Sequence, residues 1–316
     1  MKIKELKDFI DRECHIDLAI VINCVEGKSS KGSKYLSLTL QDSTGTIEAK
    51  KWEVSPSDEE ILSVKKVVAL DGYPLIYNGN QLQYKIVDVE PVQNYNEEDL
   101  ILDAPVNRKL LEEKFLGYID AIEDVEIKTI VKEVVFEHYQ KLLVHPAAKT
   151  NHHEYAGGLL HHEVSMLDLA KQIAILYPTI NKDLLFGGII LHDLGKIIEL
   201  SGPIATEYTI EGKLIGHISI IQTAIIEAAK KHNIQGEVVT LLQHMILSHH
   251  GKLEYGSPVL PLILEAEVMY LIDNMDSKIV MINKALKDVE VGGTSSRIMG
   301  LDGRSFYKHH KTKNIN

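Results

Sequence analysis

Two residues that can bind a metal ion stand together near the middle of the chain. The apolar run LLFGGIILHDLGK, residues 184–196, ends in His192 and Asp193, and Gly195 and Lys196 follow closely. An imidazole and a carboxylate that adjoin at the end of a buried segment suit Zn, Mn, Fe or Co. Two ligands alone do not complete a site, so other parts of the chain have to supply further donors.

Further donors lie in the second half of the chain. Twelve of the fifteen histidines fall between His138 and His250. Asp273 stands in the otherwise apolar stretch YLIDNMDSK, where an aspartate is costly to bury unless a cation or hydrogen bonds compensate it. Asp276, three residues later on the same helical stretch, is an alternative ligand. The additional metal-ligand candidates are His162, His217, His249, His250 and Asp273.

These donors need helices to position them, and the sequence predicts such helices. From residue 105 to about residue 285, apolar residues recur at helical spacing with short Gly or Pro interruptions. His162 opens an amphipathic helix, His192 and Asp193 close the next one, and Asp273 sits on a late one. The second part of the chain is therefore predicted to be all-α.

The first part of the chain shows a different period. Between residues 16 and 92, short runs of β-branched and aromatic residues alternate with turn signals, which favours a small antiparallel sheet or barrel. Around Leu36, Leu38 and Leu40 apolar and polar residues alternate, as in a half-buried strand. The sequence DSTG, residues 42–45, supplies a tight turn into the next strand.

This pattern resembles the OB-fold nucleic-acid-binding domains, in which such a turn joins two long strands of a Greek-key barrel. The resemblance implies that aromatic rings stack on bases while nearby lysines follow the backbone. Each of these residues also has a structural interpretation, because an aromatic ring can pack in the barrel and a lysine can simply be solvated. The nucleic-acid-binding candidates are Tyr35, Lys50, Lys51, Trp52, Tyr77 and Tyr84.

The metal candidates resemble the H…HD…D signature of the HD-domain metal-dependent phosphohydrolases, an all-α fold. The matching residues are His162, His192 with Asp193, and Asp273, and Lys196 matches the lysine of the HDxGK form. The stretches IEGKLIGHI and SHHGKLEYGSP, which contain the remaining histidine candidates, resemble the extra histidines of HD enzymes that hold two metals.

An OB-like domain followed by an HD domain is similar, over almost the whole chain, to the YhaM-type 3'-to-5' exoribonucleases. The stretches GGLLHHEVS, HDLGKIIELSGP and EYTIEGKLIGHI match that family's pattern. The resemblance implies metal-dependent hydrolysis of phosphodiester bonds in single-stranded RNA, with single-stranded DNA as an alternative substrate and a homo-oligomer left open. It also implies two divalent ions, with Mn preferred and Co, Fe, Mg and Zn as alternatives.

The same resemblance implies a role for each candidate. Asp193 bridges the two ions, which together activate a water and clamp the attacked phosphate. Lys196 contacts the phosphate. The first ion is held by His162, His192 and Asp273, and the second by His217, His249 and His250. Because adjacent residues on a helix point about 100° apart, His250 remains open as a direct ligand.

Two other functions compete with this interpretation. One is an HD phosphohydrolase that acts on nucleotides or cyclic dinucleotides. SHHGKLEYGSP partly matches the HHExxDGxGYP box of cyclic-di-GMP phosphodiesterases, although Glu254-Tyr255 and Ser257-Pro258 depart from it. The other is an RNA-holding protein with a degenerate HD pocket, which is disfavoured because every expected ligand type is present.

Composition limits the class of protein. The formal net charge of −11 at 316 residues argues against a protein that coats nucleic acid through its cations. Residues 1–95 carry 12 Lys and Arg against 15 Asp and Glu, a balance of −3, so RNA has to be bound locally. Two cysteines cannot form a disulfide framework, and a charged start without a long apolar run predicts a cytoplasmic protein without a membrane segment.

The predicted organisation is a multidomain β + α chain. Residues 1–95 form an OB-like β-barrel and 96–104 an acidic linker. Residues 105–290 form the all-α HD domain, and 291–316 form a basic tail that is solvated or frayed, with a phosphate-steering arm as the alternative.

Overall fold

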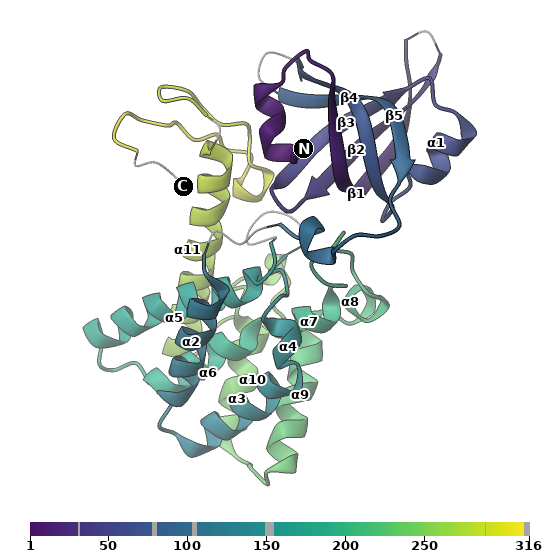
Figure 1. The fold of residues 1–316 in the computed structure, drawn as a ribbon. Helices are drawn as coiled ribbons and strands as arrows, with labels where there is room; N and C mark the ends of the chain where they lie inside the picture. The colour runs from purple at the N-terminus through teal and green to yellow at the C-terminus, as the bar shows by residue number, and fades with distance from the viewer. Residues whose placement is uncertain (31, 78–80, 103–105, 149–154, 288, 313–316) are drawn as a thin grey trace. The chain divides into compact units, whose positions relative to one another are not determined.

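The chain divides into two compact units. One comprises Met1–Asp103 together with Pro203–Thr206, and the other Ala104–Gly202 together with Glu207–Asn316. The first unit is built on strands and the second on helices, drawn from purple to blue and from teal to yellow in Figure 1. A β-barrel followed by a helical domain confirms the predicted fold class. The computed structural model describes residues 1–30, 32–77, 81–102, 106–148, 155–287 and 289–312.

Five strands close into a barrel in the order β1-β2-β3-β5-β4. β3 and β5 run parallel, and the other neighbours run antiparallel, which is the arrangement of an OB-like Greek-key barrel. A short helix, α1 (Pro56–Ile61), lies between β3 and β4 in the chain. The strands are β1 (Cys14–Lys28), β2 (Lys34–Asp42), β3 (Gly45–Trp52), β4 (Val67–Tyr77) and β5 (Gln81–Pro91).

The predicted turn after β2 is held by one carboxylate. Asp42 Oδ1 accepts hydrogen bonds from the backbone N of Thr44 at 2.7 Å and of Gly45 at 3.2 Å, while Oδ2 accepts from the backbone N of Ile3 at 2.8 Å. Asp42 therefore fixes the turn and also ties the N-terminal segment to the barrel. Leu36, Leu38 and Leu40 point into the barrel core, as their alternation predicted. Residues 78–80, between β4 and β5, lie outside the described residues.

The segment predicted as a linker contributes to the first unit. Residues Glu97–Leu100 form a 3₁₀ helix, and Leu100 is fully buried in a cluster with Ile20 and Val67. Gln41 Nε2 donates to the Leu100 carbonyl at 2.9 Å, which ties this helix to β2. The acidic residues of the stretch are exposed, as its composition suggested, while Leu100 and hydrogen bonds to the backbone anchor it to the barrel. The predicted boundary at residues 104 and 105 lies outside the described residues.

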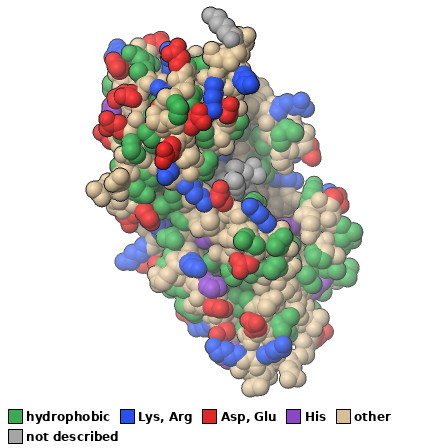
Figure 2. Space-filling model, turned by 90° about the vertical axis from the view of Figure 1, so that its right-hand side faces the viewer, with side chains coloured by type: hydrophobic (Ala, Val, Ile, Leu, Met, Phe, Trp, Pro, Cys, Tyr) green, Lys and Arg blue, Asp and Glu red, His purple; other side chains and the backbone are tan. Residues whose placement is uncertain are grey.

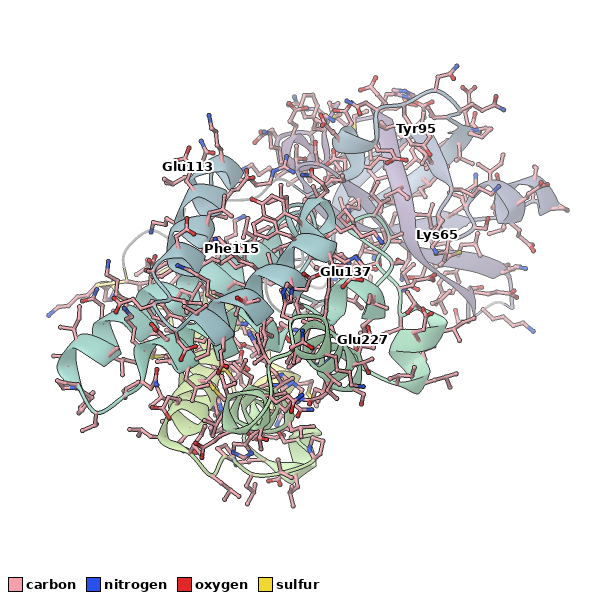
Figure 3. The ribbon with its side chains drawn as sticks, turned by 90° about the horizontal axis from the view of Figure 1, so that it is seen from below. Lys65, Tyr95, Glu113, Phe115, Glu137 and Glu227 are labelled. Atoms are coloured by element: carbon pink, nitrogen blue, oxygen red, sulfur yellow. The ribbon has the colours of Figure 1, made fainter. Side chains whose placement is uncertain are left out.

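The second unit is a bundle around a buried helix. In α6, every residue from Leu184 to His192 is buried, and Phe115 of α2, labelled in Figure 3, belongs to the same core. Among the described helices, none has the length and apolar character needed to cross a membrane. The helices are α2 (Arg108–Asp120), α3 (Val125–Glu137), α4 (Tyr139–Leu142), α5 (Gly158–Leu176), α6 (Lys182–His192), α7 (Lys196–Glu199), α8 (Ile210–Leu214), α9 (His217–Lys231), α10 (Glu237–Ser248) and α11 (Leu264–Leu286).

The C-terminal segment is folded rather than frayed over its described part. Bridges pair Thr294 with Tyr307 and Ile298 with Arg304, and Leu301 is buried. Lys308 Nζ donates to the carbonyl of Leu286 at 2.9 Å, at the end of α11. Most of its described residues are exposed, as its basic composition suggested, but the buried leucine and the pairing hold the segment in place.

Charges of both signs are mixed on the surface. Figure 2 shows Lys and Arg side chains interspersed with Asp and Glu on the face that it presents. The formal net charge of −11 therefore does not appear on this face as a field of one sign.

Glycines on α6 let neighbouring helices approach it closely. A Cβ at Gly187 would lie 2.7 Å from Cγ2 of Ile127 on α3, a stiff β-branched side chain. By contrast, a Cβ at Gly117 on the exposed side of α2 would meet no described atom within 4 Å. The two positions offer a matched pair for testing how tightly α6 is packed.

Gly187→Ala is expected to destabilise the helical unit, while Gly117→Ala is expected to stabilise it. Overpacking costs about 1–3 kcal/mol, which outweighs the gain of about 0.5–1 kcal/mol from replacing glycine in a helix. At Gly117 only the gain remains. The stability of both variants is measured by thermal unfolding, followed by the circular dichroism signal of the helices. If the Gly187→Ala protein is as stable as the Gly117→Ala protein, the packing between α6 and α3 can accommodate an extra methyl group.

Candidate metal centre

His192 and His249 stand at the ends of two helices, and the same kind of hydrogen bond orients both rings. His192 is the last residue of α6, and its Nδ1 lies 2.7 Å from the carbonyl of Ile189. His249 caps α10, and its Nδ1 lies 2.7 Å from the carbonyl of Ile246. The last carbonyls of a helix lack helical partners, and a carbonyl can only accept, so Nδ1 carries the proton. Each Nε2 therefore presents a lone pair that can bind a metal.

His162 on α5 is oriented by two aspartates of α11. Its Nδ1 lies 2.7 Å from Oδ2 of Asp276, and its Nε2 lies 3.3 Å from Oδ1 of Asp273. Burial lowers the pKa of His162, but the bonds to Asp273 and Asp276 outweigh burial and raise the pKa to about 10. A cation at Nε2 therefore has to displace a proton. This geometry favours Asp273, on the Nε2 side, as the ligand and Asp276 as the residue that orients the ring.

His217, the first residue of α9, is held by a carboxylate that the sequence did not single out. Glu199 Oε1 accepts from the backbone N of His217 at 3.1 Å and lies 3.1 Å from its ring Nδ1. Although burial acts to raise the pKa of Glu199, its bonds to His217 lower that pKa below the usual value. The Nε2 of His217 is consequently directed toward Asp193. A charged residue inside the apolar run IIEL was the available signal for Glu199.

Asp193 lies between the two groups of histidines. Its Oδ2 is 3.3 Å from His192 Nε2 and 3.9 Å from His162 Nε2. Its Oδ1 is 3.6 Å from His217 Nε2 and 3.9 Å from His249 Nε2. Each carboxylate oxygen therefore faces a different pair of imidazoles.

Lys196 neutralises this carboxylate. Its Nζ lies 2.6 Å from Asp193 Oδ2, and the side chain is largely buried. Burial acts to raise the pKa of Asp193, but the charges of Lys196 and His192 hold the pKa well below its usual value. Before any phosphate binds, the ammonium of Lys196 is therefore already held beside Asp193.

The donor set fits divalent metal ions. Within the described part of the chain, several buried atoms have no hydrogen-bond partner, which is costly unless another group satisfies them. The ligand atoms of His162, His192 and Asp193 lie within 4.8 Å of one another, and so do those of His217, His249 and His250. His250 thus joins the second group, its ring centroid 4.1 Å from that of His249. The unpartnered atoms include Asp193 Oδ1 and the Nε2 atoms of His192, His217 and His249.

Glu163 is a second buried carboxylate that the sequence did not single out. Both of its oxygens are buried, and neither has a hydrogen-bond partner among the described residues. Burial raises the pKa of Glu163 to about 8. Its place beside His162 on a buried helix face was the available signal.

On the barrel, four of the nucleic-acid candidates form one aromatic cluster, consisting of Tyr35, Lys50, Trp52 and Tyr77. The ring centroids of Tyr35 and Trp52 are 4.7 Å apart. Lys50 Nζ lies 5.3 Å from the centroid of Tyr35, 5.8 Å from that of Trp52 and 5.3 Å from that of Tyr77. Gly27 leaves room for this arrangement, because a Cβ there would lie 2.4 Å from Cζ of Tyr35.

The other two candidates lie elsewhere. The prediction for Tyr84 was wrong: its ring is fully buried in the barrel, and its hydroxyl donates to the Cys14 carbonyl at 2.7 Å, so it cannot stack on a base. Lys51 Nζ donates to the Val87 carbonyl at 2.6 Å, and its side chain is largely buried. A ring that fills the core and a lysine bound to the backbone do not form part of an accessible binding face.

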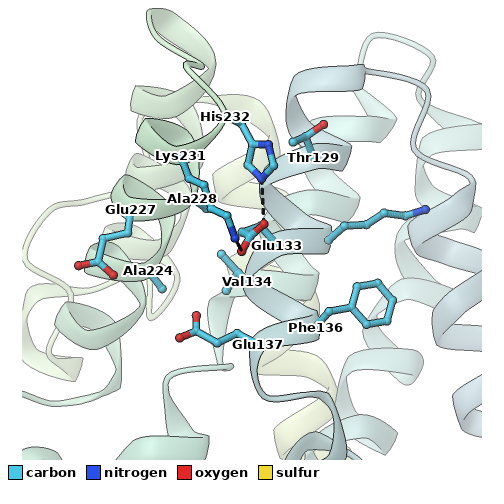
Figure 4. A pocket seen from close by; sticks show the side chains of 11 residues that line it. Thr129, Glu133, Val134, Phe136, Glu137, Ala224, Glu227, Ala228, Lys231 and His232 are labelled. Carbon is cyan, nitrogen blue, oxygen red and sulfur yellow. Dashed lines mark hydrogen bonds and ion pairs between the residues drawn. The ribbon is translucent and has the colours of Figure 1, made fainter.

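A groove lies away from the histidines of the metal centre, between α3 and α9 (Figure 4). It has a volume of about 740 Å³, and none of its lining residues is a predicted metal ligand. Glu133 lies 2.6 Å from Lys231 Nζ and 2.8 Å from His232 Nε2 there. Glu137 and Glu227, labelled in Figures 3 and 4, also line it. His232 is therefore a surface histidine that can serve as a control for the buried ones.

Comparisons with known proteins agree with this site. A family model described as the HD domain matches residues 159–278, a range that includes every predicted metal ligand. The chain is 45% identical over 297 residues to the 3'-5' exoribonuclease YhaM of Geobacillus sp. (strain WCH70), covering 93% of this chain and 91% of that protein. The expected HD domain, a domain that binds divalent metal, is thereby confirmed.

Solved structures of lower identity align with parts of the chain. The second OB-fold domain of replication protein A from Methanococcus maripaludis is 22% identical, with coverage of 30% of this chain and 97% of that domain and a TM-score of 0.24. The mitochondrial single-stranded DNA binding protein Rim1 from S. cerevisiae is 14% identical, with coverage of 28% and 100% and a TM-score of 0.22.

Adding Mn²⁺ is expected to stabilise the helical unit, and removing metal with a chelator is expected to reverse this. An ion that binds only the folded state contributes about 2.7 kcal/mol at a concentration of 100 times its Kd. Thermal unfolding with and without Mn²⁺ measures the effect. His192→Ala and His217→Ala should each reduce the stabilisation, whereas His232→Ala should retain it. Equal stabilisation of all three variants would show that Mn²⁺ binds elsewhere.

Proposed function

The chain belongs to the family of the YhaM 3'-5' exoribonucleases, and on that premise we propose that its buried His–Asp centre removes nucleotides one at a time from the 3' end of single-stranded RNA. Single-stranded DNA is the alternative substrate. The observation that carries the proposal is the position of Asp193, with each carboxylate oxygen facing imidazoles of a different donor group.

We assign the metal ligands from these two groups. His162, His192 and Asp273 would hold one ion, and His217, His249 and His250 the other, with Asp193 shared between them. When bound, divalent ions supply an activated water and neutralise charge on the attacked phosphate. A shell rich in imidazole does not suit Mg²⁺, which prefers oxygen ligands, and among the remaining candidates, Mn, Co, Fe and Zn, we propose manganese on the family resemblance.

The side chains around these ligands have their own tasks. Glu199 and Asp276 hold the rings of His217 and His162, so that Nε2 of each points inward. Lys196 balances the charge of Asp193, and we propose that its ammonium also contacts a nonbridging phosphate oxygen of the substrate. Positioning of this kind is typical of residues that surround metal ligands.

We further propose that the aromatic cluster of the barrel binds single-stranded RNA. Tyr35 and Trp52 present adjacent rings, and Lys50 lies over both and over Tyr77. Trp52 and Tyr77 are exposed, with 39% and 45% of their surface accessible. Rings of this kind stack on any base, so the cluster would hold RNA without reading its sequence.

Wild-type protein with Mn²⁺ is expected to shorten 5'-labelled single-stranded RNA stepwise from the 3' end. Asp193→Asn should slow this by about 10³-fold or more, because metal stabilisation of the transition state is worth several kcal/mol and about 1.4 kcal/mol corresponds to a factor of ten. Product ladders on a denaturing gel measure both proteins, and circular dichroism checks that the variant is folded.

Three outcomes would contradict this proposal. Internal cuts alone would indicate an endonuclease, and recession of the 5' end would indicate the opposite polarity. Full activity in Asp193→Asn would remove that residue from the metal centre.

Trp52→Ala is expected to weaken binding of single-stranded RNA by about 10-fold or more, since one base–aromatic stack contributes about 1–3 kcal/mol. Tyr95→Ala is the control, because Tyr95, labelled in Figure 3, is an exposed aromatic residue of the same unit outside the cluster. Fluorescence anisotropy in the presence of a chelator measures affinity without turnover. If both variants bind equally well, the aromatic cluster is not the binding face.

A further inference from the structure

A second cavity of the helical unit opens beside the metal centre. It has a volume of about 270 Å³, and His250 and Asp273, both assigned above as metal ligands, form part of its wall. The rest of the wall combines aromatic, amide and cationic side chains from α11 and from the loop after α10. These include Tyr255, Tyr270, Asn274 and Lys278.

We propose that this cavity holds the 3'-terminal nucleotide of the substrate, which is the nucleotide about to be released. The inference rests on the proposed exonuclease function. Removal from a free end requires a place for one nucleotide beyond the scissile phosphate, and that place must adjoin the ligands that bind the metals. A volume of about 270 Å³ is near the lower limit of about 300 Å³ for pockets that hold a small molecule, so it suits one nucleotide rather than several.

Tyr255 provides the stacking surface. More than half of its surface, 54%, is accessible, and Lys252 Nζ lies 5.3 Å from its ring centroid. An aromatic ring next to a cation suits a base attached to a phosphate, because the ring can stack on the base while the cation attracts the phosphate.

Tyr270 links the cavity to the metal-binding histidines. A Cβ at Gly251, which follows His249 and His250, would lie 2.2 Å from Cδ2 of Tyr270, so this ring packs directly on the backbone there. The Nδ2 of Asn274 donates to the Tyr270 hydroxyl at 3.2 Å and fixes the other end of the ring. Gly251 has a φ of +74°, which glycine adopts without strain. The ring is therefore held in place before any substrate arrives.

The polar part of the cavity suits a sugar and a phosphate. Lys278 contributes an ammonium, and Ser277 Oγ lies 3.2 Å from Oδ1 of Asp273. The C-terminal segment also takes part, because Gly300 belongs to the wall and a Cβ there would lie 3.3 Å from Sδ of Met281. The folded C-terminal segment thus contributes to the wall of the cavity.

The test pairs a change in the protein with a change in the substrate. Removal of the first nucleotide is measured as kcat/KM for an RNA oligonucleotide and for the same oligonucleotide whose 3'-terminal ribose lacks its base. For wild-type protein and for Tyr255→Phe, kcat/KM should fall about 10-fold or more when the base is absent. Tyr255→Ala should show little further loss, because its stacking partner is already missing. Tyr177 is an exposed tyrosine at the end of α5, and Tyr177→Ala should show the same fall in kcat/KM as wild-type protein.

A binding measurement without turnover supports the kinetics. The Kd of adenosine 5'-monophosphate for the 316-residue chain, measured by calorimetry, should rise about 10-fold in Tyr255→Ala and remain unchanged in Tyr177→Ala. Thermal unfolding shows whether each variant is folded, and Tyr255→Phe tests the ring separately from its hydroxyl.

The results distinguish this inference from the proposed function. Suppose that wild-type protein shortens RNA from the 3' end, but that removal of the base lowers kcat/KM as much in Tyr255→Ala as in wild-type protein. The cavity then does not hold the terminal nucleotide. If wild-type protein does not shorten RNA from the 3' end, the exonuclease proposal itself is wrong.

Discussion

One buried carboxylate sets the geometry of the helical unit. Asp193 meets Lys196 through Oδ2 and faces imidazoles of His192 and His162 on one side and of His217 and His249 on the other. An isolated charge in the interior is costly, so all of these partners have to converge on one place. Three helices satisfy that requirement by ending or beginning there: α6 ends at His192, α9 begins at His217 and α10 ends just before His249.

Helix ends serve this purpose for a physical reason. Near the ends of α6 and α10, the carbonyls of Ile189 and Ile246 each accept a hydrogen bond from Nδ1 of the nearby histidine. The backbone is thereby satisfied, and both Nε2 atoms face the centre. Gly195 allows the start of α9 to approach the turn after Asp193, because a Cβ there would lie 2.3 Å from the His217 carbonyl. The glycine of the HDLGK stretch is thus explained by packing, and its aspartate and lysine by charge.

Periodicity in the sequence predicted more of the fold than composition did. Helical spacing identified the all-α unit, and alternation around Leu36, Leu38 and Leu40 identified the barrel. Composition correctly indicated that the acidic residues before Leu100 and most residues around Leu301 are exposed, but it gave no sign that one buried leucine holds each stretch in place. The sequence offered Asp276 only as an alternative ligand and did not single out Glu199, because their orienting roles depend on contacts with histidines 114 and 18 residues away.

The same alternation also separates the binding candidates on the barrel. Along β3, Ile47 and Ala49 point inward, so Lys51 follows them while Lys50 and Trp52 share the opposite face. Along β5, Tyr84 and Ile86 are both buried, which places the Tyr84 ring in the core. What remains outside is a set of rings with one lysine over them, whereas Lys34 is paired with Glu26 and Glu59. On the proposal that this cluster binds RNA, stacking on the rings would contribute more than the displacement of counterions, because Lys50 is the lysine that lies over the rings and the chain has a net charge of −11.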